Sequence, residues 1–169
     1  KYNFKLKPQI NHLKKKMQQP KNDMEYRRLG STGMTVSVIA FGPQMFMFGA
    51  KVPPEIEQLT YQTLEGAFEL GVNYIDTGEF YGAGLIETYI GNALKKMGTD
   101  RENFVISTKI FMGPAGGVNS TGCSRKRLIG GLKASLKRLQ LDYVNIVFAS
   151  RYDYGTSLEE VCRAMDHLI

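Results

Sequence analysis

Short apolar runs alternate with longer amphipathic stretches along most of this chain, and this alternation limits the possible fold more than any other feature. Four runs are expected to be strands, and they are VSVIAFG (36–42), VNYID (72–76), NFVISTKIF (103–111) and YVNIVFAS (143–150). Helices are expected over 55–70 and 86–97, from a cap at Ser124, and from a capping box of Thr156 with Glu159. Strands that alternate with helices form a parallel sheet.

A β-hairpin is expected ahead of the first of these strands. Residues 24–37 contain Gly30 and Gly33 between short runs of mixed polarity, a pattern typical of two strands joined by a tight loop. The hairpin and four β-α units then fit two architectures. One is an open doubly wound sheet, and the other is a (β/α)8 barrel, which needs about 250 residues.

The net charge of +6 belongs to one end of the chain. Residues 1–23 hold seven lysines and one acid, whereas residues 24–169 hold equal numbers of basic and acidic residues. We expect 1–23 to be a disordered basic tail, most simply a solvated leader, with an arm for nucleic acid or acidic lipid as the alternative. The remaining body has no net charge that would indicate a specific nucleic-acid partner.

Several absences restrict the class of protein further. No run of about 18 apolar residues occurs, so a membrane span is not expected. No secretory apolar segment follows Lys1, and Cys123 and Cys162 lie far apart, which indicates reduced thiols in a cytosolic protein. His12 and His167 have no ligand spacing around them, so a metal site is not expected.

Polar side chains stand where the predicted strands end. Asp76 closes the second strand within the motif DTGEFYG, and Tyr81 follows in the next loop. Lys109 and Ser150 stand at the ends of the third and fourth strands. Because the carboxyl ends of parallel strands share one rim, where ligands bind, we expect Asp76, Tyr81 and Lys109 to converge there.

The chemistry of these three residues is coherent. A tyrosine has a reference pKa of about 10, and a nearby ammonium lowers it. Tyr81 would then act as a general acid assisted by Lys109, with Asp76 orienting the lysine, and such a donor suits a carbonyl that is reduced to an alcohol. Taken singly, each residue has a plainer interpretation: a turn or cap for Asp76, packing for Tyr81 and a solvated amine for Lys109.

Two glycine-rich segments are weaker signals. GAGLIE (82–87) lacks the third glycine of a dinucleotide-binding loop and does not directly follow a strand, so a Rossmann fold is not indicated. GPAGGVNSTG (113–122) is either an ordinary surface loop, which is the simpler interpretation, or a substrate lid.

Four segments together resemble a known family. GVNYIDTGEFYG, STKIFMG, SRKRLIGGLKASLKRLQLDYVNIVFASRYD and EEVCRAMDHLI are similar to the aldo-keto reductases, and within them to the β subunits of voltage-gated potassium channels. The resemblance covers about 24–169. It implies an α/β fold of the (β/α)8 TIM-barrel type with an N-terminal β-hairpin, of which this chain holds the first half, and it implies NADPH-dependent reduction of aldehydes and ketones.

The resemblance also implies a catalytic set. Asp76, Tyr81 and Lys109 match the family's catalytic residues position by position. Ser150 stands at the fourth catalytic position, where the family commonly has histidine and the channel β subunits have asparagine. A serine there can still hydrogen-bond a carbonyl or a carboxamide, although its side chain is shorter.

Cofactor contacts are implied at the same rim and in the loop after the first strand. Asp76 and Ser150 are expected to contact NADPH. In the loop, Pro43 and Gln44 replace the Thr-Trp of the β subunits, and Lys51 stands near a position where they have glutamine. The family's remaining cofactor contacts would come from the second half of the barrel.

Three functions remain open on this basis. The chain could be the amino-terminal half of a reductase that acts on a small carbonyl substrate, a regulatory subunit that docks beneath a potassium channel α subunit, or a truncated structural paralogue in a larger assembly. The resemblance implies a homo-oligomer in the cytoplasm, peripheral at the membrane where a channel partner binds it.

Overall fold

The computed structural model describes residues 23–43, 52–114 and 116–169. Its strands are β1 (Tyr26–Arg28), β2 (Thr35–Ser37), β3 (Ala40–Phe41), β4 (Tyr74–Asp76), β5 (Val105–Ile110) and β6 (Ile146–Ala149). Its α-helices are α2 (Glu55–Glu69), α3 (Leu85–Met97), α4 (Arg125–Leu139) and α5 (Leu158–Asp166), and two 3-10 turns are η2 (Tyr81–Gly84) and η3 (Arg101–Asn103). The predicted tail lies almost wholly outside these residues.

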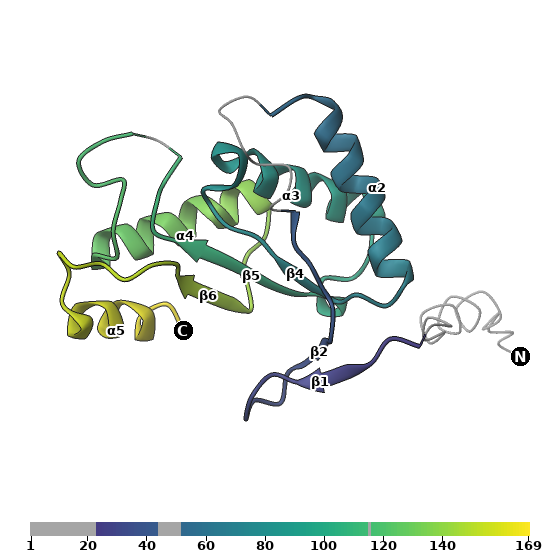
Figure 1. The fold of residues 1–169 in the computed structure, drawn as a ribbon, viewed down its shortest axis with the longest axis horizontal. Coiled ribbons are helices and arrows are strands. Elements are labelled where there is room, and N and C mark those ends of the chain that lie inside the picture. The colour runs from purple at the N-terminus through teal and green to yellow at the C-terminus, as the bar shows by residue number, and fades with distance from the viewer. Residues whose placement is uncertain (1–22, 44–51, 115) are drawn as a thin grey trace, which may run out of the picture.

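The main sheet has four strands in the order β3-β4-β5-β6, and every neighbouring pair is parallel. Chain order and spatial order are therefore the same. Figure 1 shows α2, α3 and α4 along one side of this sheet. A doubly wound sheet would have helices on both faces, whereas strands that follow in sequence beneath one layer of helices are the arrangement found in a (β/α)8 barrel. The barrel interpretation is confirmed.

The core lies between the sheet and its helical layer. Ile75 of β4 and Ile106 of β5 are fully buried against Ile86 and Ile90 of α3. A second cluster joins β5 to α4 and α5 through Ile110, Leu128, Cys123 and Ala164. Since alternate residues of a strand point to opposite faces, burying Ile75 and Ile106 turns Asp76 and Ser107 toward the other face of the sheet.

The hairpin is confirmed, but the strand predicted over 36–42 is split. β1 and β2 pair antiparallel, with Arg27 opposite Val36. β2 ends at Ser37, whose hydroxyl donates to Ile39 O at 2.6 Å and whose N–H donates to Asn73 Oδ1 at 2.7 Å. These side-chain hydrogen bonds replace ladder hydrogen bonds and let the chain pass from the hairpin to β3.

Helix ends follow the expected capping chemistry with one correction. Ser124 caps α4, because its hydroxyl accepts from Arg127 N at 3.3 Å. The expected capping box of Thr156 with Glu159 is wrong by one residue: Ser157 caps α5 by accepting from Glu160 N at 3.2 Å. The Thr156 hydroxyl donates instead to Asp153 Oδ2 at 2.7 Å, which removes it from competition for the cap.

Two predicted absences can be compared with the described part of the chain. No helix there is long and apolar enough to cross a membrane. No group of three or more His, Cys, Asp or Glu side chains there is arranged to hold a metal ion.

Candidate active site

An ion pair joins the ends of β4 and β5. Asp76 pairs with Ser107 in the parallel register, which places Lys109 two residues further along the same face of β5. Lys109 Nζ lies 2.5 Å from Asp76 Oδ2 and also donates to Thr77 O at 3.0 Å. The two side chains are 24% and 30% exposed, so the pair is anchored in the sheet but reachable from solvent.

The hydroxyl of Ser107 supports this ion pair through a hydrogen bond to Asp76. Ser107 Oγ donates to Asp76 Oδ1 at 2.6 Å, so the two oxygens of the carboxylate have different partners. Ser107 is fully buried. This buried donor, on the face of the sheet opposite the helices, fixes the orientation of the Asp76 carboxylate. The carboxylate in turn holds the ammonium of Lys109.

Tyr81 begins η2, directly beyond this pair. Lys109 Nζ lies 5.1 Å from the centroid of the Tyr81 ring. Gly78 lies against both groups: a Cβ at that position would be in ordinary contact with them, 3.4 Å from Lys109 Cβ and 3.5 Å from Tyr81 Cε1. Gly82, at φ +53°, then turns the chain toward α3 in a left-handed conformation that glycine favours.

The other predicted site residues are less closely associated. Ser150 follows β6 on the same rim and is exposed, and its backbone N–H donates to Ile110 O at 3.0 Å. Pro43 follows β3 and is buried. Gln44 and Lys51 lie outside the described residues. The structure therefore brings Asp76, Tyr81 and Lys109 together, and it places Ser150 and Pro43 at the carboxyl ends of neighbouring strands.

Sequence reasoning missed three residues that touch this region. Ser107 could have been found from the two-residue period of β5, which puts it on the face of Lys109. Glu79, within DTGEFYG, is 1% exposed and forms an ion pair with Arg127 of α4, which is 8% exposed. No local pattern marks that partnership, because the two residues belong to different β-α units.

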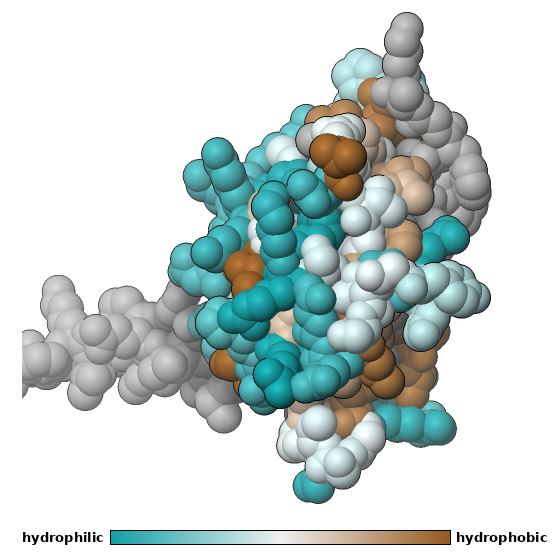
Figure 2. All heavy atoms as spheres, turned by 90° about the vertical axis from the view of Figure 1, so that its left-hand side faces the viewer, coloured by the Kyte–Doolittle hydropathy of each residue, from teal (hydrophilic) through white to brown (hydrophobic). Residues whose placement is uncertain are grey.

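The carboxyl ends of the strands point to one side of the molecule. Figure 2 faces the side toward which the strands of Figure 1 point, and hydrophilic residues occupy much of its centre.

Asp153, in the loop after β6, accepts from Cys123 N at 2.7 Å and Gly155 N at 2.9 Å. The Thr156 hydroxyl and these two N–H groups lower the pKa of Asp153, whereas burial raises the pKa of the Cys123 thiol.

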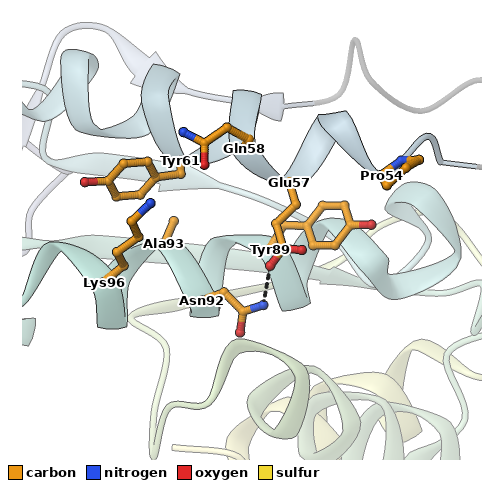
Figure 3. A pocket seen from close by; sticks show the side chains of 8 residues that line it. All are labelled: Pro54, Glu57, Gln58, Tyr61, Tyr89, Asn92, Ala93 and Lys96. Carbon is orange, nitrogen blue, oxygen red and sulfur yellow. Dashed lines mark hydrogen bonds between the residues drawn. The ribbon is translucent and has the colours of Figure 1, made fainter.

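A separate pocket lies on the helical side of the molecule. It has a volume of about 220 Å³ and lies between α2 and α3 (Figure 3). Asn92 Nδ2 donates to Glu57 Oε1 across it at 2.6 Å, and Lys96 Nζ lies 3.8 Å from the Tyr61 ring centroid. Its lining includes none of Asp76, Tyr81 and Lys109, so this pocket is distinct from the strand-end site.

Four sequential parallel strands, with a lysine, an aspartate and a tyrosine at their carboxyl ends, define an α/β protein of the (β/α)8-barrel type. Residues 39–169 match the model of the aldo/keto reductase family, and the chain belongs to this family. Among solved structures it is similar to a thermostable aldo-keto reductase crystallised with the inhibitor epalrestat, at 28% identity and a TM-score of 0.73. The match covers 85% of this chain and 49% of that one, so the chain spans about half the length of this relative.

Proposed function

We propose that this chain carries the proton-donating half of an NADPH-dependent aldo-keto reductase that converts aldehydes or ketones to alcohols. The observation that carries the proposal is the Asp76–Lys109 ion pair of 2.5 Å with the lysine ammonium 5.1 Å from the centroid of the Tyr81 ring. Three groups from two β-α units that meet at one rim form a constellation typical of acid–base chemistry. Membership of the aldo/keto reductase family supports the same reaction class.

Each residue then has a distinct role. Tyr81 donates its hydroxyl proton to the carbonyl oxygen as negative charge develops there. Lys109 places a positive charge beside the donor, and Asp76 holds that charge in place. Ser107, through its 2.6 Å hydrogen bond, orients Asp76 without touching the substrate. Ser150 hydrogen-bonds the carbonyl or the cofactor carboxamide.

The residues present fit the reacting end of a nicotinamide cofactor. Asp76 and Lys109 are partly exposed at the rim, so a flat ring and a carbonyl can approach them from solvent. Asp76 and Ser150 would contact the nicotinamide end, and Pro43, Gln44 and Lys51 would contact it from the loop after β3. NADPH, when bound, supplies the hydride, and the chain's own residues supply the proton.

The remainder of the protein is also part of the proposal. The chain spans 49% of the related reductase. Residues 24–169 would form the first half of the barrel, and four further β-α units would complete the sheet and the adenine end of the cofactor site. Residues 1–23 would form a basic tail. The assembled protein would be a cytoplasmic homo-oligomer.

A turnover assay tests the reductase. Protein that contains the complete barrel is mixed with NADPH and an aromatic aldehyde, and oxidation of the cofactor is followed by its absorbance, with NADH in a parallel sample. The proposal expects alcohol in an amount equal to the NADPH consumed and a preference for NADPH over NADH. If the protein neither binds NADPH nor oxidises it, the reductase is excluded.

A regulatory potassium-channel subunit is the second candidate. It is favoured by the segments TKIFMG (108–113) and LKASLKRLQLDYV (132–144), which are similar to those of channel β subunits. The test is co-purification with the cytoplasmic tetramerisation domain of a channel. A complex of defined stoichiometry supports this function and a location at the inner membrane surface, and failure to bind removes it.

A further inference from the structure

A buried ion pair lies behind the candidate site, and the catalytic roles above do not use it. Glu79 is 1% exposed and Arg127 is 8% exposed, and their side chains contact each other between the loop after β4 and the first turn of α4. Burying two charges carries a desolvation penalty that their attraction offsets only in favourable geometry. Apolar residues of similar volume would therefore serve packing alone at least as well.

The Glu79 side chain continues the hydrogen-bond ladder between β4 and β5. Beyond Asp76, Thr77 N donates to Ser107 O at 3.0 Å and Glu79 N donates to Lys109 O at 3.3 Å. The next donor, Phe111 N, meets the Glu79 carboxylate oxygen at 2.8 Å instead of a backbone carbonyl. The backbone is thus free to leave the sheet after Glu79 while the loop stays attached to β5.

The position of the Tyr81 ring depends on the place where the chain leaves the sheet after β4. Its N–H donates to Gly78 O at 3.1 Å, and its ring packs over Gly78. Glu79 lies within this turn, where its backbone N–H is held at Lys109 O and its carboxylate is held at Phe111 N. A shift of Glu79 along β5 would therefore move the Tyr81 ring relative to the Lys109 ammonium.

Arg127 fixes the carboxylate in turn. Its Nε donates to Ser120 O at 2.9 Å, so the guanidinium is held by the loop after β5 as well as by Glu79. Two glycines make room for it: a Cβ at Gly113 would lie 2.8 Å from Arg127 Nη2, and one at Gly131 would lie 2.4 Å from Arg127 Nη1. A side chain enclosed in this way keeps one orientation.

We propose that Glu79 and Arg127 are positioning residues that set the place of the Tyr81 hydroxyl relative to Lys109. The inference rests on the proposed function of Tyr81 as the proton donor. Neither residue touches the substrate in this account. They act by fixing the point at which the loop 77–82, which follows β4, turns away from its hydrogen bonds to β5. A small misplacement of a reacting group lowers the rate far more than it lowers binding.

The test compares Glu79→Gln with a matched control, Glu87→Gln. Glu87 is also fully buried, and it is also paired with an arginine, Arg138 at 2.8 Å, but it accepts from Thr108 on the helical side of β5. Glu79→Gln is expected to lower kcat by roughly ten- to a hundredfold with KM within about twofold of wild type. Glu87→Gln is expected to lower the melting temperature while kcat stays within about twofold.

A double variant separates positioning from stability. Glu79→Gln with Arg127→Met removes the unpaired buried guanidinium that the single variant leaves, so the melting temperature should recover. If the pair positions Tyr81, kcat stays low in the double variant although stability returns. Recovery of kcat together with stability, or equal losses of kcat in Glu79→Gln and Glu87→Gln, would overturn the inference.

Hydrogen exchange gives a readout that needs no turnover. In Glu79→Gln the amides of 77–84 and of Phe111 should exchange at least about tenfold faster than in wild type, whereas Glu87→Gln should leave them unchanged. Exchange that is unchanged in Glu79→Gln contradicts the inference even if the wild-type chain shows no reductase activity. An inactive wild type with faster exchange in Glu79→Gln would instead reject the proposed function and retain the anchoring of the loop.

Discussion

At the scale of single residues, the Asp76–Lys109 pair is partly exposed to solvent and braced on one side by a buried hydroxyl. Partly exposed ion pairs contribute little to stability, about 0–1 kcal/mol. The pair has 24% and 30% exposed side chains, so its value to the protein lies in holding a charge at a defined place. Ser107 likewise has a positioning role, since its hydrogen bond orients the Asp76 carboxylate.

Replacement of Lys109 should therefore separate activity from stability. We expect Lys109→Met to lower kcat/KM by about 10²- to 10⁴-fold, the range over which a general acid and its assistants act. The melting temperature should change by only a few degrees. Steady-state kinetics and thermal unfolding of the same preparation check this. If Lys109→Met lowers the melting temperature strongly while kcat/KM stays close to that of wild type, the lysine is mainly structural.

Asp153 makes stability depend on pH. Its hydrogen bonds to Thr156, Cys123 and Gly155 lower its pKa below the ordinary value of 3.8. A carboxylate whose pKa is lower in the folded state stabilises the protein above the unfolded value, and this contribution is lost as the pH falls through the folded value. Asp153→Asn should therefore be less stable than wild type at pH 7, and the difference should shrink below about pH 4. Denaturant titrations across this range measure it, and a constant difference would contradict the assignment.

The chain pattern was sufficient to expect Asp76, Tyr81 and Lys109 at one rim, because Asp76 ends its apolar run, Tyr81 follows in the next loop and Lys109 is a charged residue near the end of its run. Ser107 lies inside its run and looked like a strand residue. Glu79 was visible within DTGEFYG, but its burial depends on Arg127, which lies in a different β-α unit. Contacts between units arise from packing of the helical layer, and a linear pattern carries no signal for them.

At the scale of elements, helix α4 shows how packing overrides propensity. Gly130 and Gly131 are neighbours in its middle, and glycine weakens a helix by about 1 kcal/mol relative to alanine. A Cβ at Gly130 would meet no neighbouring group within 4 Å, whereas a Cβ at Gly131 would lie 2.6 Å from Ile110 Cγ2. One glycine is thus required by the approach of α4 to β5, and the other is not.

The two glycines should respond oppositely to alanine. Gly130→Ala is expected to stabilise the protein by about 0.5–1 kcal/mol through helix propensity. Gly131→Ala is expected to destabilise it by about 1–3 kcal/mol, because Ile110 and Arg127 must move to admit the methyl group. Chemical denaturation of both variants measures the difference. Equal effects of the same sign would mean that α4 lies further from β5 than the structure shows.

The elements also show the limit of boundary prediction. The helices were expected close to their true positions because periodicity and glycine ends mark them: Gly71, at φ +90°, follows α2, and Gly98, at φ +61°, ends α3. The split between β2 and β3 was not expected, because VSVIAFG is continuous in hydropathy. Side-chain hydrogen bonds of Ser37 and Asn73 make that break, and hydropathy does not register them.

At the scale of the whole molecule, the described part of the sheet has two outer strands, β3 and β6, each paired on one side only. Phe148 of β6 is 43% exposed at one of these edges. An unpaired apolar edge favours association with another strand. In a complete barrel the next β-α unit would cover this edge, which agrees with a chain that spans 49% of a related reductase.

The open edge predicts self-association of the chain when it is purified alone. Phe148→Lys should shift the equilibrium toward the monomer, because charge on an edge strand opposes pairing. Val118→Lys is the control, since Val118 is fully exposed in the loop after β5 and is not part of β6. Sedimentation at several concentrations measures both. Equal association of wild type and Phe148→Lys would contradict a role for the β6 edge.

The most direct test of the account is the single-turnover rate of NADPH oxidation by an aromatic aldehyde in wild type, Tyr81→Phe and Tyr89→Phe. Tyr89 lies on α3 and lines the separate pocket, so its variant controls for the loss of a hydroxyl elsewhere. We predict that Tyr81→Phe lowers the rate at least about a hundredfold, the lower end of the contribution of a general acid, with NADPH binding retained. The rate of Tyr89→Phe should equal that of wild type. A Tyr81→Phe rate within a few fold of wild type would show that the proton comes from another group, and the account would be wrong.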